Sequence, residues 1–179
     1  ARRFVENEIV PNDPRWREQH HVDRELWNKA GEVGLLCTDI PDQYGGVGGD
    51  ARHEAVVVAE VGRRGITSFG HTVHSILAHY VLNYGSEAQK HDWLPRMASG
   101  ELVGAIAMTE PGAGSDLQAV KTSAVKDGEG YYTVNGAKTF ITNGWNADLV
   151  ITVAKTKPAL GAKGTSLVLV ERGMPGFER

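Results

Sequence analysis

The stretch MTEPGAGSD, from Met108 to Asp116, combines one proline and two glycines with hydroxyl and acidic residues. It follows the apolar run LVGAIA, from Leu102 to Ala107, which is typical of a buried strand. A plain connector needs fewer special residues, so we expect this turn to do more than redirect the chain. Its backbone N–H groups are not committed to strand pairing and can form an anion-binding concavity, to which the Ser115 hydroxyl adds a donor.

Glu110 and Asp116 are the objection to an anion site in this turn, because carboxylates facing a phosphate would repel it. We therefore expect both side chains to point away and to hold the turn by accepting backbone N–H hydrogen bonds. Thr109, at the end of the expected strand, can bond the edge of a heterocycle. On these residues alone, a loop for a polar ligand is only slightly favoured over an elaborate structural turn.

The segment KTFITNG, from Lys138 to Gly144, carries an aromatic residue two positions before a threonine. In a strand, this spacing places Phe140 and Thr142 on the same face of the sheet. A ring and a hydroxyl on one face suit a flat conjugated ligand, since one packs against it and the other bonds its edge. The alternative is that Phe140 packs in the core, and without other information that alternative is preferred.

The hydrophobic period of the chain changes near Gly100. Before it, apolar residues at three- and four-residue steps, together with capping residues, predict four or five helices. Thr67 or Ser68 is expected to cap a helix from Phe69 to Tyr84, and Pro95 is expected to kink the next helix or end it early.

After Gly100, five short segments rich in Val, Ile, Thr and Tyr predict strands, separated by turn residues such as those of Asp127–Gly130. These segments are Val103–Met108, Thr122–Lys126, Tyr131–Lys138, Leu149–Ala154 and Ser166–Val170. Closely spaced strands without helices between them favour an antiparallel sheet or barrel. The predicted fold class is therefore α+β, with an all-helical domain at residues 1–100 and a middle β domain at 101–179.

The composition fits a globular protein, with 41% hydrophobic and 23% charged residues and a net charge of −3. The negative charge and the absence of a long basic stripe argue against a nucleic-acid binder. No run of about 18 apolar residues predicts a membrane-spanning helix. The single cysteine, Cys37, is interpreted as a small buried hydrophobic residue. The chain starts inside an expected helix and ends in a turn, so we expect it to be part of a longer protein.

Two further groups of residues are interpreted as structural. His71 and His74 lie one helical turn apart, but no carboxylate joins them within the segment, so we expect part-buried or surface histidines, with His79 nearby, and no metal site. The loop Gly45–Gly49 lies between two expected helices rather than between a strand and a helix. It is therefore interpreted as a turn and not as a phosphate-binding loop.

Taken together, the two polar segments resemble the acyl-CoA dehydrogenase family. The resemblance rests on Ala107–Asp116, on NGAK at Asn135–Lys138 and on FITNG at Phe140–Gly144. Upstream, Pro41–Gly49 and Tyr84–Lys90 are similar to the family's glycine-rich loop and to the start of its fifth helix. The resemblance covers nearly the whole chain in order, and within the family it is strongest to the long-chain branch.

The resemblance implies a fold of three domains, of which the C-terminal helical bundle is absent from this chain. It also implies FAD as cofactor and oxidation of an acyl-CoA thioester to the trans-2-enoyl-CoA, by α-proton abstraction and β-hydride transfer to flavin N5. The family's glutamate base lies in the C-terminal domain, so no catalytic residue is expected here and the fragment alone is expected to be inactive. Further implications are an electron-transfer flavoprotein as acceptor, a homotetramer when the protein is complete, and location in the bacterial cytoplasm, which is weakly favoured, or in the mitochondrial matrix.

The resemblance also implies site residues, which fall into three groups. Ile106, Met108 and Thr109 match positions lining the flavin ring, Gly114 and Ser115 match positions at the FAD pyrophosphate, and Phe140 and Thr142 match the aromatic and hydroxyl groups against the flavin. Ser115 also matches a position that touches the acyl-CoA, and many relatives have Trp at the position of Phe140.

Two other functions stay open from sequence. One is a sister flavoenzyme of the same fold, an acyl-CoA oxidase or a flavin monooxygenase. The other is a non-catalytic acyl-CoA-binding or assembly protein, against which the intact Thr109, Ser115 and Thr142 argue.

Overall fold

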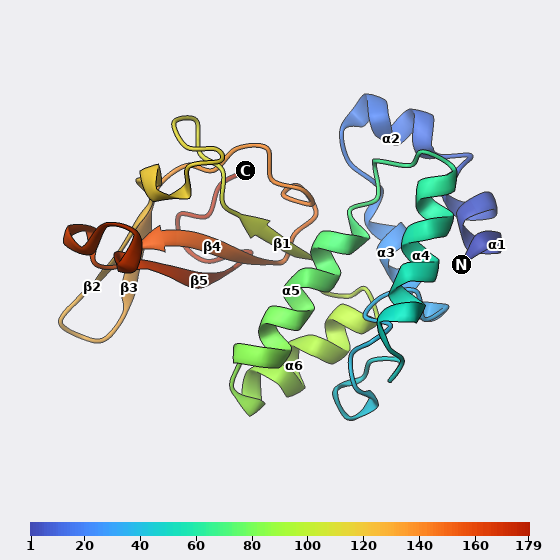
Figure 1. Cartoon of the computed structure of the whole chain (residues 1–179), viewed down its shortest axis with the longest axis horizontal. Coiled ribbons are helices and arrows are strands. Elements are labelled where there is room, and N and C mark those ends of the chain that lie inside the picture. Colours follow the sequence, from blue (N-terminus) through green and yellow to red (C-terminus); the bar gives the residue numbers. More distant parts are fainter.

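The computed structural model describes all 179 residues, with helices in the first part of the chain and strands in the second (Figure 1). The helices are α1 (Arg2–Phe4), continued by a π-helical turn at Val5–Ile9, α2 (Asp13–Gln19), α3 (Arg24–Glu32), α4 (Ala51–Arg63), α5 (His71–Tyr84) and α6 (Glu87–Ala98). The strands are β1 (Gly104–Ala107), β2 (Ser123–Lys126), β3 (Tyr132–Asn135), β4 (Leu149–Lys155) and β5 (Thr165–Glu171). The predicted order of helices followed by five strands is confirmed. No helix combines the length and the apolar character needed to cross a membrane.

The helix boundaries differ from expectation in two places. The prediction that Thr67 or Ser68 caps a helix is wrong, because α5 begins at His71 with Gly70 in the cap position. The Ser68 hydroxyl is engaged elsewhere, donating to the Asp13 carboxylate at 2.6 Å. Of the kink or early stop expected at Pro95, the early stop does not occur, since α6 continues to Ala98.

The sheet is mixed, with β4 at its centre. β5 pairs antiparallel with β4 along its whole length, and β2 and β3 form an antiparallel hairpin. β1, however, runs parallel to β4, from the pair Gly104↔Leu149 to the pair Ala107↔Thr152. The expectation of a purely antiparallel sheet is therefore corrected. The long connection between β1 and β4 permits the crossover that a parallel pair requires.

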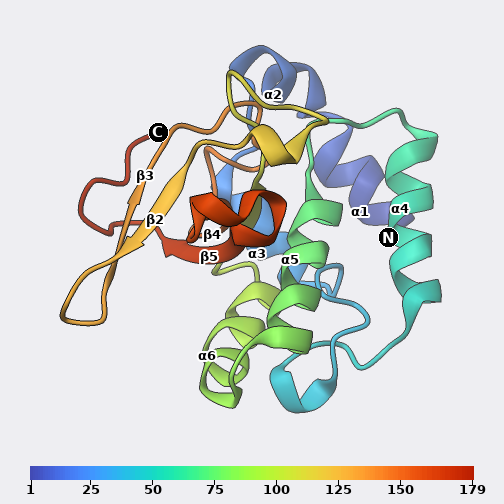
Figure 2. The same cartoon turned by 60° about the vertical axis from the view of Figure 1, so that its left-hand side comes forward.

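The turn at Asp127 confirms the predicted hairpin. The Asp127 side chain accepts hydrogen bonds from the backbone N–H groups of Glu129 and Tyr131, both at 2.9 Å. The β2–β3 hairpin extends away from the helices (Figure 2).

A shared core joins the helices to the sheet. Leu77 of α5 and Met97 of α6 are fully buried in one cluster with Leu149 and Ile151 of β4. Gly104 of β1 allows close packing at this contact, because an added Cβ would lie 3.2 Å from side-chain atoms of Leu77 and Met97, which would have to shift slightly. This packing fixes the strand that leads into the polar turn.

Candidate functional site

The chain reverses direction soon after it leaves β1. Glu110 and Ala113 exchange two backbone hydrogen bonds, at 2.8 and 3.1 Å, which close a tight turn. A Cβ added at Gly112 or Gly114 would meet no atom within 4 Å, and neither glycine lies at a positive φ. Neither contacts within the chain nor backbone conformation therefore explains these two glycines. Gly112, Gly114 and Ser115 are exposed and open to approach by a ligand, whereas Ala113 between them is buried.

The two acids of this turn accept backbone N–H groups, as expected, but those groups belong to residues that follow the turn. The Glu110 carboxylate accepts the backbone N–H groups of Lys121 at 2.8 Å and Thr122 at 2.9 Å. The Asp116 carboxylate accepts the N–H of Gln118 at 3.0 Å. Glu110 thus ties the turn to the chain entering β2, and Asp116 caps the short helical turn Leu117–Ala119.

Glu110 also forms a buried ion pair, with the Lys138 ammonium at 2.9 Å. Burial by itself would raise the pKa of Glu110. Hydrogen bonds from the Thr122 hydroxyl, the Lys121 backbone and Lys138 outweigh that effect and hold the pKa at about 2. The carboxylate is ionised at neutral pH and fully engaged, so it is not placed to act as a general base.

The segment that follows Lys138 lies beside the end of β1. The Thr139 N–H donates to the Thr109 carbonyl at 2.9 Å, and the Lys138 ammonium donates to the Met108 carbonyl at 3.0 Å. Two stretches about 30 residues apart, which the sequence had singled out separately, are thus brought together.

Phe140 contradicts both expectations made for it. It does not lie in a strand with Thr142, because the segment is a loop in which Phe140 has a φ of +56° and Asn143 a φ of +65°. Nor is it a core residue, since it is 92% exposed. A bulky residue at positive φ is strained, and such strain concentrates at functional sites.

The seven residues expected at the site fall on three neighbouring segments. Ile106 lies in β1, Met108 and Thr109 follow it, Gly114 and Ser115 belong to the glycine turn, and Phe140 and Thr142 lie in the later loop. Ile106 and Thr109 are half-buried and the other five are exposed. Hydrogen bonds connect the first and third segments directly, whereas none links Ser115 to Phe140 or Thr142.

A cleft of about 380 Å³ borders Thr142. It lies between α2 with its following turn and the loop at residues 141–146, and Arg17, His21 and Trp145 are among its lining residues. The Asn146 amide donates to the Val22 carbonyl at 2.7 Å and holds the two walls together.

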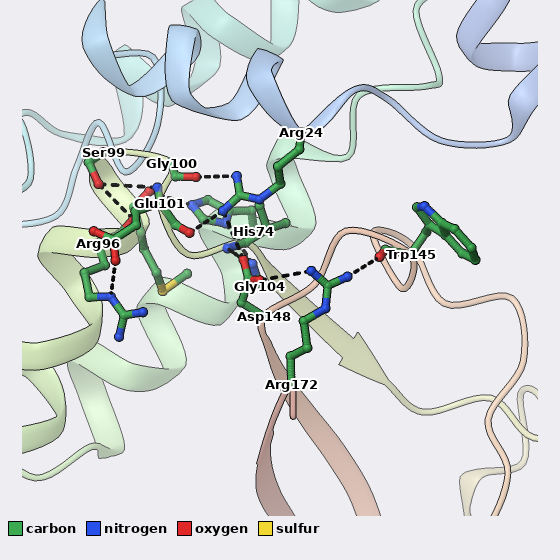
Figure 3. Close-up of polar contacts among 12 residues, drawn as sticks. Arg24, His74, Arg96, Ser99, Gly100, Glu101, Gly104, Trp145, Asp148 and Arg172 are labelled. Carbon is green, nitrogen blue, oxygen red and sulfur yellow. Dashed lines mark hydrogen bonds and ion pairs between the residues drawn. The ribbon is translucent and has the colours of Figure 1, made fainter. Parts of the chain in front are cut away.

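A junction of polar residues joins the helices to the start of β1 (Figure 3). The His74 imidazole accepts the Gly104 N–H at its Nδ1 and donates from Nε2 to the Met97 carbonyl at 3.1 Å. Complete burial lowers the pKa of His74 to about 4, so the ring is neutral. Arg24 of α3 donates to the Gly100 carbonyl at 2.6 Å and to the Asp148 carboxylate at 3.1 Å.

Sequence reasoning assigned no role to Lys138, Asn143, Arg24 or Asp148, and it interpreted His74 as one of several unremarkable histidines. Lys138 and Asn143 did lie inside a segment singled out for its composition. The partners of Arg24 and His74 are distant in sequence, so no local pattern could have identified them.

Comparison with known proteins assigns both parts of the chain. The sequence profile of the acyl-CoA dehydrogenase N-terminal domain matches residues 1–101, and that of the acyl-CoA dehydrogenase middle domain matches residues 105–179. The mitochondrial long-chain specific acyl-CoA dehydrogenase of Sus scrofa is 49% identical over 99% of this chain and 42% of its own length.

Comparison with solved structures gives the same family. An acyl-CoA dehydrogenase from Geobacillus kaustophilus superposes with a TM-score of 0.93 at 45% identity, covering 99% of this chain and 47% of that chain. A glutaryl-CoA dehydrogenase from Mycobacterium smegmatis in complex with FADH2 gives 0.86 at 33% identity, covering 99% and 45%. A chain from a structure of the electron transferring flavoprotein of Acidaminococcus fermentans gives 0.88 at 37% identity, covering 98% and 47%. The chain thus spans less than half the length of each of these proteins.

Proposed function

Because the chain belongs to the acyl-CoA dehydrogenase family, we propose that it is the N-terminal and middle part of an FAD-dependent enzyme that oxidises acyl-CoA to trans-2-enoyl-CoA. The observation that carries the proposal is the meeting of two segments, Met108–Ser115 and Phe140–Thr142, through the bonds of Lys138 and Thr139. The identity of 49% to a long-chain specific enzyme supports long-chain acyl-CoA as substrate.

The residues present fit FAD. Phe140 offers an exposed ring held at a strained φ, with Thr142 two residues later. The open backbone at Gly112 and Gly114 can approach a diphosphate without obstruction from a Cβ. FAD, when bound, would supply the acceptor for the substrate's β-hydride.

The residues of this chain would bind and orient. Met108 and Thr109 would line the flavin ring together with Ile106. Gly114 and Ser115 would hold the pyrophosphate, and Ser115 would also contact the acyl-CoA. Glu110 is committed to structural bonds, so we place the base that removes the α-proton outside these 179 residues.

The partner and assembly state are part of the proposal. The likeness to a chain from an electron transferring flavoprotein structure supports such a flavoprotein as electron acceptor. We further propose a homotetramer for the complete protein, with the compartment depending on its source, since relatives include mitochondrial and bacterial enzymes.

The test is an anaerobic titration of the flavin-loaded complete protein with acyl-CoAs of graded chain length. We expect the visible flavin absorbance to bleach most readily with long chains and enoyl-CoA to form. Rapid reoxidation by oxygen would instead indicate an oxidase, and a protein that takes up no flavin would contradict the proposal. The isolated 179-residue chain should form no enoyl-CoA.

Thr109→Ala and Ser115→Ala test the site residues in the complete protein. Each removes one hydroxyl bond to the cofactor and should lower FAD affinity about tenfold. Normal FAD content and turnover in the double variant would show that this site is misplaced.

A further inference from the structure

Glu110 is a buried carboxylate that lies between the two parts of the proposed cofactor site. Thr109 precedes Glu110 and the glycine turn follows it. Glu110 is only 8% exposed. Burying a charge is unfavourable unless the charge is paired and hydrogen-bonded, so its position needs a compensating arrangement.

The compensation comes from three residues. The N–H groups of Lys121 and Thr122, the Thr122 hydroxyl and the Lys138 ammonium all donate to the Glu110 carboxylate. These bonds connect the turn after β1 both to the chain entering β2 and to the segment that carries Phe140.

Lys138 extends the arrangement to the backbone beside Thr109. Its ammonium donates to the Met108 carbonyl as well as to Glu110, and its neighbour Thr139 donates to the Thr109 carbonyl. The carbonyls of two successive residues are therefore held by one short segment. Because Phe140 and Thr142 follow directly in that segment, its position sets their distance from Thr109.

The pairing also removes an electrostatic obstacle. An unpaired Glu110 would place a negative charge beside the turn proposed to hold a diphosphate. With the Lys138 ammonium at 2.9 Å, the pair carries no net charge. The carboxylate can then organise the turn without repelling the anion.

We propose that the Glu110–Lys138 ion pair is a positioning device that fixes the glycine turn and the Phe140–Thr142 segment in the geometry that binds FAD. The inference rests on the proposed function. Neither side chain touches the cofactor in this proposal. Together they hold the residues that do, so that little ordering remains to be done when FAD binds.

The experiment uses the complete protein with Glu110→Gln, Lys138→Met and the double variant. Glu129→Gln and Lys126→Met are the matched controls, because both residues are exposed in the same part of the chain and take no part in the pair. FAD affinity is measured by flavin fluorescence and normalised to the folded fraction from circular dichroism. The absorbance band shape of bound flavin reports on the surroundings of its ring.

We expect each single variant to weaken FAD binding about 10- to 100-fold, the loss that corresponds to one charge-assisted hydrogen bond. The double variant should lose less than the sum of the two single losses, since both single variants disrupt the same ion pair. The bound flavin spectrum should change in all three, while both controls match the parent.

Several results would overturn the proposal. One is that the single variants fold and keep the parent's FAD affinity and flavin spectrum. Another is that the losses in FAD affinity of the two single variants simply add in the double variant. If Glu110→Gln does not fold, Lys138→Met tests the same pair, and failure of both to fold would assign the pair to folding alone. A parent protein that takes up no FAD would overturn the proposed function itself and this inference with it.

Discussion

The Nδ1 atom of His74 accepts a hydrogen bond from the backbone N–H of Gly104 at 3.0 Å (Figure 3). This single contact joins the first turn of α5 to the first residue of β1, and the opposite ring nitrogen bonds the Met97 carbonyl near the end of α6. Protonation of Nδ1 would break the bond to Gly104, so the folded protein requires the neutral ring.

This requirement predicts an acid-sensitive stability. The pKa of His74 is lowered by burial from 6.5 to about 4, so between these values the unfolded chain binds a proton that the folded chain does not. The contribution is fully present above pH 6.5 and is lost as the pH falls to about 4. Its size is on the order of 3 kcal/mol in the free energy of unfolding, measured by urea denaturation across this range.

His74→Asn is the decisive variant, because its amide oxygen can accept the Gly104 N–H but does not titrate. It should be less stable at neutral pH and show a flatter pH dependence. His20→Asn, at an exposed position, should follow the parent. Burial also lowers the pKa of His71, which stays in both proteins, so only the difference between the slopes reports on His74. If the free energy of unfolding changed with pH equally in the parent and in His74→Asn, the assignment of the acid sensitivity to His74 would be contradicted.

A second prediction concerns Asp148, whose carboxylate accepts the N–H of the fully buried Val103 at 2.8 Å and pairs with Arg24. Asp148→Ala should lower the free energy of unfolding by about 1–3 kcal/mol, because it leaves the Val103 N–H without a partner. Asp148→Asn keeps an acceptor and should lose less, since the part-exposed ion pair contributes about 1 kcal/mol or less. Chemical denaturation checks both, with Glu129→Ala as a neutral surface control. An equal loss for Ala and Asn would show that charge, not the N–H bond, dominates.

A third prediction separates the two roles of Asn143. Its amide donates to the carbonyls of Gly70 and Gly104 at 2.9 and 3.1 Å, and its φ of +65° is one that Asn adopts more readily than most residues. Asn143→Gly removes the bonds but keeps the conformation available, whereas Asn143→Ala removes the bonds and adds strain. We expect Ala to be less stable than Gly by about 1 kcal/mol in thermal unfolding. The reverse order would mean that the backbone freedom of Gly in the unfolded chain lowers the stability more than the strain of Ala at a positive φ does.

A fourth prediction sets stability against binding at Phe140. Its side chain is 92% exposed at a φ of +56°, so it adds strain with little packing. Phe140→Gly should raise the stability of the FAD-free protein by about 1 kcal/mol. The same change should weaken FAD binding, while Phe140→Trp should retain it. Tyr84→Ala is the control, since Tyr84 is 82% exposed without a positive φ. Loss of stability in Phe140→Gly would show that the ring packs against this chain after all.

The secondary structure was largely predictable because it rests on local chemistry. The capping box of α6, with Ser86 and Gln89 bonding each other's backbone N–H, lies within four residues, and the Asp127 turn lies within five. Local chemistry also predicted that Asp116 would accept a nearby backbone N–H, and it bonds that of Gln118 two residues on.

The errors came where distant residues override local preference. The pattern at Phe140 and Thr142 is that of a strand, yet Lys138 and Thr139 are tied to the end of β1 and Asn143 to Gly70 and Gly104, which leaves the segment as a loop. The parallel pairing of β1 with β4 could not be predicted either, because hydrophobic periodicity along the chain does not say which strands pair with each other.

The sequence by itself determined the order of helices and strands, the polar turn after β1 and the likeness to the family, because each depends on residues close together in the chain. Only the tertiary structure decided the mixed sheet, the neutral His74 between three elements and the ion pair of Glu110 with Lys138. Those features depend on burial and on contacts between residues about 30 apart, whose energies exist only after the chain has folded.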